Sequence, residues 1–156
     1  MRIVDFVRPE LVIPELRSST KPEIIEELAA FLAANLTGPS AIDREVLARA
    51  LNDREKLAST AIDQGVAIPH AKLKTLPQLV ACIGRKTAGI DFDSMDGRPT
   101  HLFFVLLAPE NSTGVHLKAL ARISRLFRDP SFRQRLMDAP DAKAIYQVIA
   151  DEDAKY

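Results

Sequence analysis

Three short runs of apolar residues constrain the fold of this chain more than any other feature. They cover residues 66–68, 79–83 and 102–107, and each is nearly continuous rather than alternating with polar residues. A continuous apolar run of this length is typical of a β-strand that is covered on both faces. Helices must supply that cover, so the pattern predicts a sheet with a helical layer on each side.

Amphipathic segments before and after these runs predict the helices. Thr20-Lys21-Pro22-Glu23 has the capping-box pattern that opens a helix, and apolar residues follow at helical spacing until Gly38-Pro39. Further helices are expected over about 40–56, 115–127, 131–137 and 141–150. Two helices, several strands and then two or three helices predict the α/β class, with a central mixed β-sheet sandwiched between helices.

The segment between the second and third predicted strands is rich in turn signals. Gly89 and Asp96-Gly97 fall within residues 87–98, and such residues are typical of turns. We expect turns and a hairpin here.

The length of 156 residues fits one domain, and no repeat, low-complexity tract or linker divides the chain. We therefore expect a single domain over residues 1–156. The one cysteine, Cys82, excludes an internal disulfide and a thiolate cluster for zinc, which suggests a reducing compartment such as the cytoplasm. Asp5 and Arg8-Pro9-Glu10 interrupt the apolar start of the chain, so we expect neither a signal sequence nor membrane insertion.

Charge is balanced over the chain, with 21 Lys and Arg against 21 Asp and Glu. A nucleic-acid partner is not expected, because the chain lacks the global positive field that such proteins usually carry. A local basic region comprises Lys118, Arg122, Arg125, Arg128, Arg133 and Arg135. A solvated helix face and a site for an acidic partner or phosphate both fit this region.

The stretch "GVAIPHAK", residues 65–72, presents a histidine directly after a predicted strand. Pro69 cannot donate to a strand ladder and biases the preceding residue toward an extended conformation. The strand is therefore expected to end there and to lift His70 to the rim of the sheet. A half-buried surface histidine and a functional one both fit this feature taken alone.

The other two histidines lie in different settings. His116 is in the first turn of the helix over 115–127, and its spacing to Leu120 and Ile123 predicts that it points inward from the apolar face. A core histidine that donates to a backbone carbonyl and a functional histidine both fit this position. His101, at the start of the last strand, is expected to be solvated and without a role, and Cys82 is expected to act as a small apolar residue within its strand.

A polar segment precedes the strand that delivers His70. It contains Arg54, Ser59 and Thr60. A guanidinium donates in a fork and hydroxyls donate singly, so this set suits an anion with several acceptor oxygens. Solvated loop residues are the alternative interpretation.

Several other chemistries lack their sequence motifs. The chain has no phosphate loop, no dinucleotide fingerprint, no H-x-x-x-H metal pair and no nucleophile elbow. His70 and His116 could share a zinc ion only with carboxylates that the sequence does not designate. We therefore expect neither a metal nor a cofactor.

Together, four blocks resemble the IIA domains of the phosphoenolpyruvate-dependent phosphotransferase system, of the fructose and mannitol type that includes the nitrogen-regulatory IIA proteins. The blocks are Arg54-Glu55-x-x-x-Ser59-Thr60, residues 65–70, Asp96-Gly97-x-Pro99 leading into residues 102–109, and His116-Leu117. The resemblance runs over nearly the whole chain and implies the same fold class.

The resemblance also implies the function. His70 would accept a phosphoryl group, as a phosphohistidine, from a histidine phosphocarrier, HPr or its nitrogen-branch relative NPr. His116 would be its neighbour in the site, and Arg54 the matching cationic residue; Arg54, Ser59 and Thr60 would donate to the phosphoryl oxygens. Histidine suits this role because it is mostly neutral near neutral pH and carries a free ring lone pair.

The chain departs from the family pattern where glycines are frequent. It has Ala58, Ala61 and Asp63 around the Ser-Thr pair, and Ala71 after the histidine. Residues other than glycine narrow the backbone conformations open to this loop.

Three functions remain open at this level. The first is a regulator of the nitrogen type, read by target proteins according to its phosphorylation. The second is a sugar-uptake component that passes its phosphoryl group to a IIB domain, and the third is an interaction module that has lost transfer. The chain carries no IIB segment, which favours the regulator.

Overall fold

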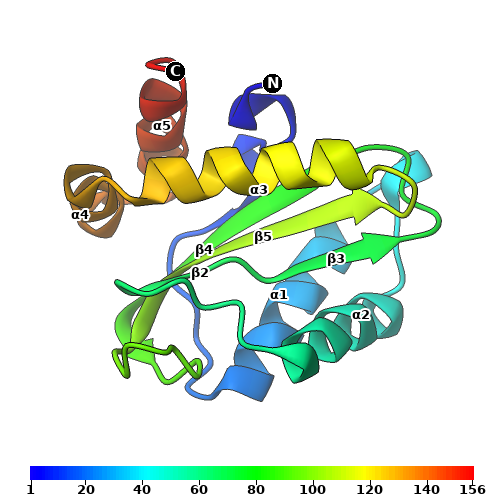
Figure 1. Cartoon of the computed structure of the whole chain (residues 1–156), viewed down its shortest axis with the longest axis horizontal. Helices are drawn as coiled ribbons and strands as arrows, with labels where there is room; N and C mark the ends of the chain where they lie inside the picture. Colours follow the sequence, from blue (N-terminus) through cyan, green and yellow to red (C-terminus); the bar gives the residue numbers. More distant parts are fainter.

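A computed structural model describes all 156 residues, and its centre is one mixed sheet of five strands (Figure 1). The strands are β1 (Val12–Ile13), β2 (Val66–Ala67), β3 (His70–Leu73), β4 (Val80–Ile90) and β5 (Thr100–Pro109). β4 and β5 form the long antiparallel pair at the centre. β1 runs parallel to β4 on one side, and β2 and β3 both run parallel to β5 on the other.

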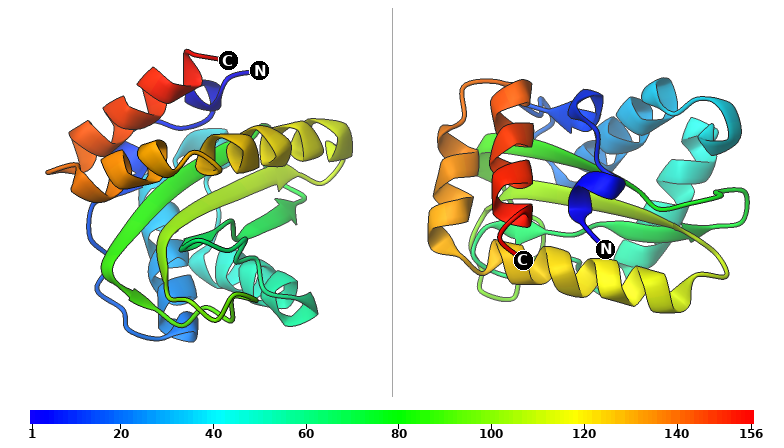
Figure 2. Two further views of the ribbon diagram at one scale, coloured as in Figure 1. Left: turned by 60° about the vertical axis from the view of Figure 1, so that its left-hand side comes forward. Right: turned by 90° about the horizontal axis from the view of Figure 1, so that it is seen from above.

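Helices cover both faces of this sheet, as Figure 2 shows. They are α1 (Lys21–Asn35), α2 (Arg44–Leu57), α3 (Thr113–Phe127), α4 (Pro130–Asp138) and α5 (Ala142–Asp153). α1 and α2 pack on one face, and the other helices pack on the opposite face together with the N-terminal segment. The predicted fold class, a mixed sheet sandwiched between helices, is confirmed.

The apolar run in β5 builds the core on both faces at once. Phe103 and Val105 join the buried cluster under α1 and α2, whereas Phe104 and Leu106 join the cluster under α3 and α5. Side chains of a strand alternate between the two faces, so a continuous apolar run is what a doubly covered strand requires. Each fully buried side chain of this size stabilises the fold by about 1.5–3 kcal/mol.

Short polar side chains fix where the helices begin. Thr20 caps α1 by accepting the Glu23 N–H at 3.4 Å, as the capping-box pattern predicts. Asp43 caps α2 and Asp141 caps α5 in the same way. None of the helices combines the length and the apolar character that crossing a bilayer requires.

β3 is a strand that the sequence pattern hides. β2 ends just before Pro69, as expected, but pairing with β5 resumes at once as β3 and matches His70 with Leu106. Pro69 lacks a donor, but its carbonyl accepts the Leu106 N–H at 2.9 Å, so the proline interrupts the ladder without ending it. His70 is therefore the first residue of β3 rather than a residue beyond a strand.

β4 also extends beyond its apolar run, to Ile90, so the turns between β4 and β5 are confined to residues 91–99. Arg85, Lys86 and Thr87 follow the apolar run, and the pairing with β5 shifts register between Arg85 and Ile90. His101 is half-buried against this irregular stretch, and its Nδ1 lies 3.1 Å from the Thr87 carbonyl. The expectation of a solvated His101 is thus wrong, because the ring packs on β4 and donates to its backbone.

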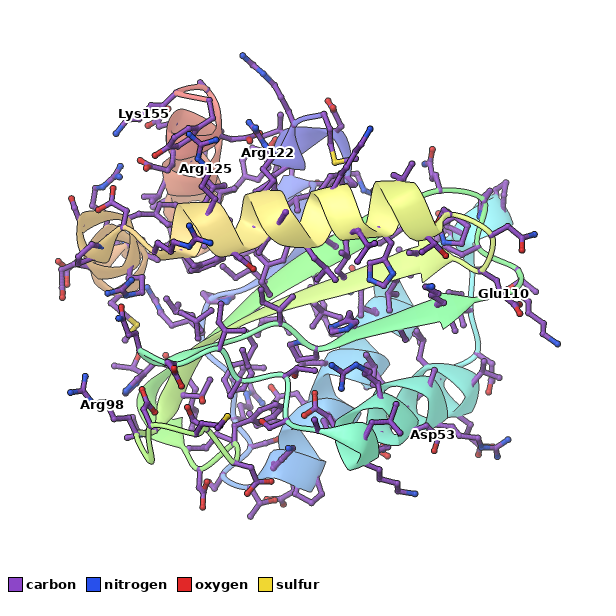
Figure 3. The ribbon with its side chains drawn as sticks, in the orientation of Figure 1. Asp53, Arg98, Glu110, Arg122, Arg125 and Lys155 are labelled. Carbon is purple, nitrogen blue, oxygen red and sulfur yellow. The ribbon has the colours of Figure 1, made fainter.

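Two arginines of the basic region form ion pairs with carboxylates of the same chain. Arg122 pairs with Asp153 at 2.5 Å, and Arg135 pairs with Glu152 at 2.7 Å. Figure 3 shows Arg122 and Arg125 on α3 near Lys155 in the C-terminal turn. These pairs fasten the end of α5 to α3 and α4, so the solvated-face interpretation does not describe Arg122.

We predict that Asp153→Ala lowers the free energy of unfolding by about 3 kcal/mol, measured by urea denaturation. Asp153 is 1% exposed, and it accepts from Arg122 and from the Val4 N–H at 3.1 Å, so its removal leaves a partly buried guanidinium unpaired. The control is Asp151→Ala on the exposed side of α5, which should change the free energy by less than about 0.5 kcal/mol. Equal effects of the two substitutions would contradict the prediction.

Candidate functional site

A groove of about 720 Å³ lies between α2, β3 and the first turn of α3. It is lined by Ala50, Asp53, Arg54, Leu57, His70, Ala71, Lys72, Thr113, His116 and Leu117. Figure 1 shows β3 lying between α2 and the first half of α3. Three residues singled out in the sequence, Arg54, His70 and His116, meet here although 62 positions separate the first from the last.

Both ring nitrogens of His70 are engaged. Nδ1 lies 2.7 Å from the Ile68 carbonyl oxygen, which can only accept, so Nδ1 carries the proton. Nε2 therefore keeps its lone pair and accepts a hydrogen bond from Arg54 Nε at 3.1 Å. Arg54 is itself anchored, because its terminal nitrogen donates to the Ala58 carbonyl at 2.9 Å.

The surroundings keep the His70 ring uncharged. Burial is the largest influence and lowers the pKa of His70 below its ordinary value of 6.5. The Ile68 carbonyl raises that pKa by holding the Nδ1 proton, whereas the charge of Arg54 lowers it and the charge of Glu55 raises it. The net direction is downward, so the ring is uncharged near neutral pH and Nε2 keeps its lone pair.

His116 faces His70 across the groove. The ring centroids are 5.5 Å apart with an interplanar angle of 74°. His116 is 5% exposed, and burial, together with the nearby His70 and Lys72, lowers its pKa to about 4. Its buried Nε2 has no hydrogen-bond partner, so the interpretation of a core histidine satisfied by a carbonyl is not supported at this atom. A buried polar atom without a partner beside His70 fits a site completed by a bound polar group.

The first turn of α3 adds positive potential to the groove. No side chain caps this turn, since the Ser112 hydroxyl donates instead to the Pro109 carbonyl at 2.7 Å. Thr113 and His116 of the same turn line the groove. Free N–H groups and the helix dipole at an uncapped N-terminus favour an anion.

Lys72 is a groove residue that sequence reasoning missed. It lies two positions after His70 in β3, on the same face of the strand, and its ammonium donates to the Thr113 hydroxyl at 3.1 Å. Side chains two positions apart in a strand lie on the same face, so a strand that includes residues 70–73 would have placed Lys72 beside His70.

Ser59 and Thr60 lie away from the groove. The Ser59 hydroxyl donates to the Phe92 carbonyl at 2.7 Å, and the hydroxyl of the buried Thr60 donates to Glu55. Neither residue is among those that line the groove. Their hydroxyls therefore hold the loop in place here and do not face His70.

The loop between Thr60 and β2 contains one glycine, Gly65, but two other residues also take the left-handed conformation that favours glycine. Asp63 and Gln64 both adopt positive φ, at 76° and 55°, which costs of order 1 kcal/mol or more for such residues. Asp96 offsets this cost, because its carboxylate accepts the Gln64 N–H at 2.9 Å and the Arg98 N–H at 3.0 Å. The Asp96-Gly97 motif thus shapes the loop that leads to the His70 strand.

The groove combines the neutral imidazole of His70, the Arg54 guanidinium that donates to its Nε2, the Lys72 ammonium and the uncapped first turn of α3. This set favours an anionic electrophile such as a phosphoryl group. No group of three His, Cys, Asp or Glu side chains comes together in the structure in a way that could hold a metal ion.

Comparisons with known proteins agree with this interpretation. Residues 5–152 match a sequence model of the family described as "Phosphoenolpyruvate-dependent sugar phosphotransferase system, EIIA 2". The chain is 48% identical over 150 residues to the nitrogen regulatory protein of Bradyrhizobium diazoefficiens, covering 96% of this chain and 95% of that protein. It is 33% identical over 155 residues to the fructose-specific EIIABC component of Bacillus subtilis, covering 98% of this chain and 24% of that protein.

The fold comparison points the same way. The crystal structure of the nitrogen regulatory protein IIA-Ntr from Neisseria meningitidis matches this fold with a TM-score of 0.87 at 31% identity. The match covers 94% of this chain and 98% of that one.

We predict that part of the acid sensitivity of this fold comes from His116. The unfolded chain binds a proton at this residue near pH 6.5 and the folded chain only near pH 4, so the unfolded state holds more protons between these values. The free energy of unfolding should therefore fall as the pH is lowered from 6.5 to about 4. His116→Gln should flatten this dependence in urea denaturation, whereas His101→Gln, outside the groove, should leave it in place. An equally steep profile in His116→Gln would contradict the prediction.

Proposed function

Because the chain belongs to the EIIA type 2 family of the phosphoenolpyruvate-dependent sugar phosphotransferase system, we propose that it accepts a phosphoryl group on Nε2 of His70. The observation that carries this assignment is the hydrogen bond from Nδ1 to the Ile68 carbonyl. With the proton held on Nδ1, Nε2 is the one ring nitrogen that keeps a lone pair, and it lies at the groove.

The transfer step needs no separate base. The Nε2 lone pair attacks the phosphorus of a phosphohistidine on the donor protein, the donor's P–N bond breaks, and its electron pair returns to the donor imidazole. The Nδ1 proton stays on His70, and the Ile68 carbonyl stabilises the positive charge that the ring gains. Arg54 Nε releases Nε2 and turns to a phosphoryl oxygen.

The remaining charge is met by groups already in the groove. Lys72, the N–H groups of the first turn of α3 and His116 Nε2 are the donors that we assign to the phosphoryl oxygens, beside Arg54. Catalysis of this kind depends on positioning and on donors aimed at the three equatorial oxygens. Ser59 and Thr60 are assigned to the shape of the loop instead.

The rim of the groove suits a small protein donor. Leu57 is 81% exposed and Leu117 is 61% exposed, and both line the groove that contains His70. Exposed apolar side chains next to a reactive atom indicate a docking surface. The histidine phosphocarrier HPr or NPr is the proposed donor. We place the transfer in the cytoplasm, a reducing compartment that suits the free thiol of Cys82.

A regulatory role is the use of this phosphoryl group that the comparisons favour. The chain is 48% identical to a nitrogen regulatory protein and 33% identical to a fructose-specific component. A phosphoryl group near neutral pH adds nearly two negative charges to the groove, enough for a target protein to distinguish the two forms without refolding. Passage to a IIB domain during sugar uptake is the second candidate, favoured by the fructose-specific relative.

We predict that the chain gains one acid-labile phosphoryl group in the presence of phosphoenolpyruvate, enzyme I and HPr or NPr. Intact-mass analysis should show the gain in wild type and in the control His101→Ala, and none in His70→Ala. His116→Ala should still be phosphorylated, but more slowly, because one donor is lost. No gain in wild type with either carrier would refute transfer and leave the interaction module.

We predict that Arg54→Gln slows phosphorylation of His70 by about 10²-fold, the usual cost of losing one donor to transition-state charge. Rapid-quench kinetics with phosphorylated carrier would measure the rate. Arg49→Gln, an exposed arginine on the same helix, controls for the change in net charge and should keep a near-wild-type rate. A rate for Arg54→Gln within threefold of the Arg49→Gln rate would exclude Arg54 from the transfer step.

A further inference from the structure

The carboxylate of Glu55 is a buried charged group that the transfer step does not use. It follows Arg54 in α2, and its side chain is 5% exposed. Its Oε1 accepts the Thr60 N–H at 3.1 Å and pairs with the Lys21 ammonium at 3.0 Å, and its Oε2 accepts the Thr60 hydroxyl. Burying a carboxylate is costly unless its oxygens are engaged, so these three donors fix both Glu55 and the residue it holds.

Thr60, which Glu55 holds, is connected to His70 by two hydrogen bonds through the backbone of Ile68. The Thr60 carbonyl accepts the Ile68 N–H at 2.9 Å. The Ile68 carbonyl in turn accepts the proton of His70 Nδ1 at 2.7 Å. Ile68 is thus bound by Thr60 on one side and by the His70 ring on the other.

A second set of contacts fixes the same loop from outside. Lys21 also pairs with Asp93 at 3.1 Å and lies over the Phe92 ring, 4.6 Å from its centroid. The Ser59 hydroxyl donates to the Phe92 carbonyl. These contacts connect the segment around Thr60 to α1 and to the turn that follows β4, and they restrict its conformation.

We propose that Glu55 is a positioning residue for His70: by holding Thr60, it fixes the Ile68 carbonyl that keeps the proton on Nδ1 and leaves Nε2 as the nucleophile. This inference rests on the proposed transfer to His70. Glu55 does not line the groove, so it acts through Thr60 and Ile68. Two consecutive residues of α2 then control the two ring nitrogens, Arg54 directly and Glu55 through the loop.

The test compares Glu55→Gln and Thr60→Val with two matched controls. Glu45→Gln removes an exposed carboxylate from the same helix, and Thr60→Ser keeps the hydroxyl. The ¹⁵N chemical shifts of the His70 ring at neutral pH, measured without donor, report which nitrogen carries the proton. Wild type and both controls should hold it on Nδ1, whereas Glu55→Gln and Thr60→Val should show a mixture of the two neutral tautomers.

The kinetic arm separates positioning from docking. The kcat for phosphorylation by carrier should fall about tenfold in Glu55→Gln and Thr60→Val, as is usual when a residue that orients a reactive histidine is lost. KM should stay within twofold of wild type, because Leu57 and Leu117 at the docking rim are unchanged. Thr60→Ser should recover the wild-type kcat.

The proposal is overturned if His70 keeps its proton on Nδ1 and kcat stays within twofold of wild type in both test variants. A lower melting temperature with an unchanged tautomer and kcat would assign a purely structural role and also overturn it. If Glu55→Gln does not fold, Thr60→Val decides, because it keeps the backbone N–H that Glu55 accepts. Failure of wild type to be phosphorylated would refute the proposed function, but the tautomer measurement needs no donor and still decides the positioning role.

Discussion

The hydrogen bond between His70 Nδ1 and the Ile68 carbonyl determines what the groove can do. A neutral imidazole has two tautomers of similar energy, and only one of them presents a lone pair at Nε2. A short bond to an atom that can only accept removes the other tautomer. The proposed nucleophile, Nε2, is therefore selected by a backbone atom, which no side-chain substitution at position 68 would remove.

The sheet makes this carbonyl available. β2 and β3 pair with the same neighbour, β5, and the ladder is interrupted between them at Ile68 and Pro69. The carbonyls of Gly65, Pro69 and Leu73 accept from β5, so Ile68, which alternates with them, points away from β5. Its N–H bonds to the Thr60 carbonyl, and its own carbonyl is left to accept from the His70 ring. Pro69 therefore keeps the ladder bond at its own carbonyl and, because it has no N–H, removes only a donor at the break between β2 and β3.

Much of the fold could be predicted from the sequence, because continuous apolar runs and capping residues such as Thr20 report burial and helix starts locally. The meeting of Arg54, His70 and His116 in one groove followed from the family resemblance and not from spacing. The roles of Lys72, Ser59 and Thr60 could not be predicted, since each depends on a tertiary partner. β3 could not be predicted because the expectation rested on the missing N–H of Pro69. The carbonyl of Pro69 still accepts a hydrogen bond from β5, and pairing continues after it.

Arg54 presents an apparent conflict, because it donates a hydrogen bond to the lone pair that attacks in the proposed transfer. A hydrogen bond from a charged donor contributes about 1.5–3 kcal/mol net. In the proposed transfer Arg54 exchanges this bond for one to a phosphoryl oxygen, so a docked donor can displace it at small net cost. The arginine also lowers the pKa of His70 and so keeps a proton off Nε2, which would block attack far more completely. Glu55, the next residue, acts in the opposite direction on the same ring, and the two charges together limit the positive potential at a ring that must itself become cationic.

After transfer the balance changes, since the phosphoryl group brings nearly two negative charges within reach of Arg54. The same guanidinium then stabilises the product, so the interaction that holds the ring at rest also favours the phosphorylated state.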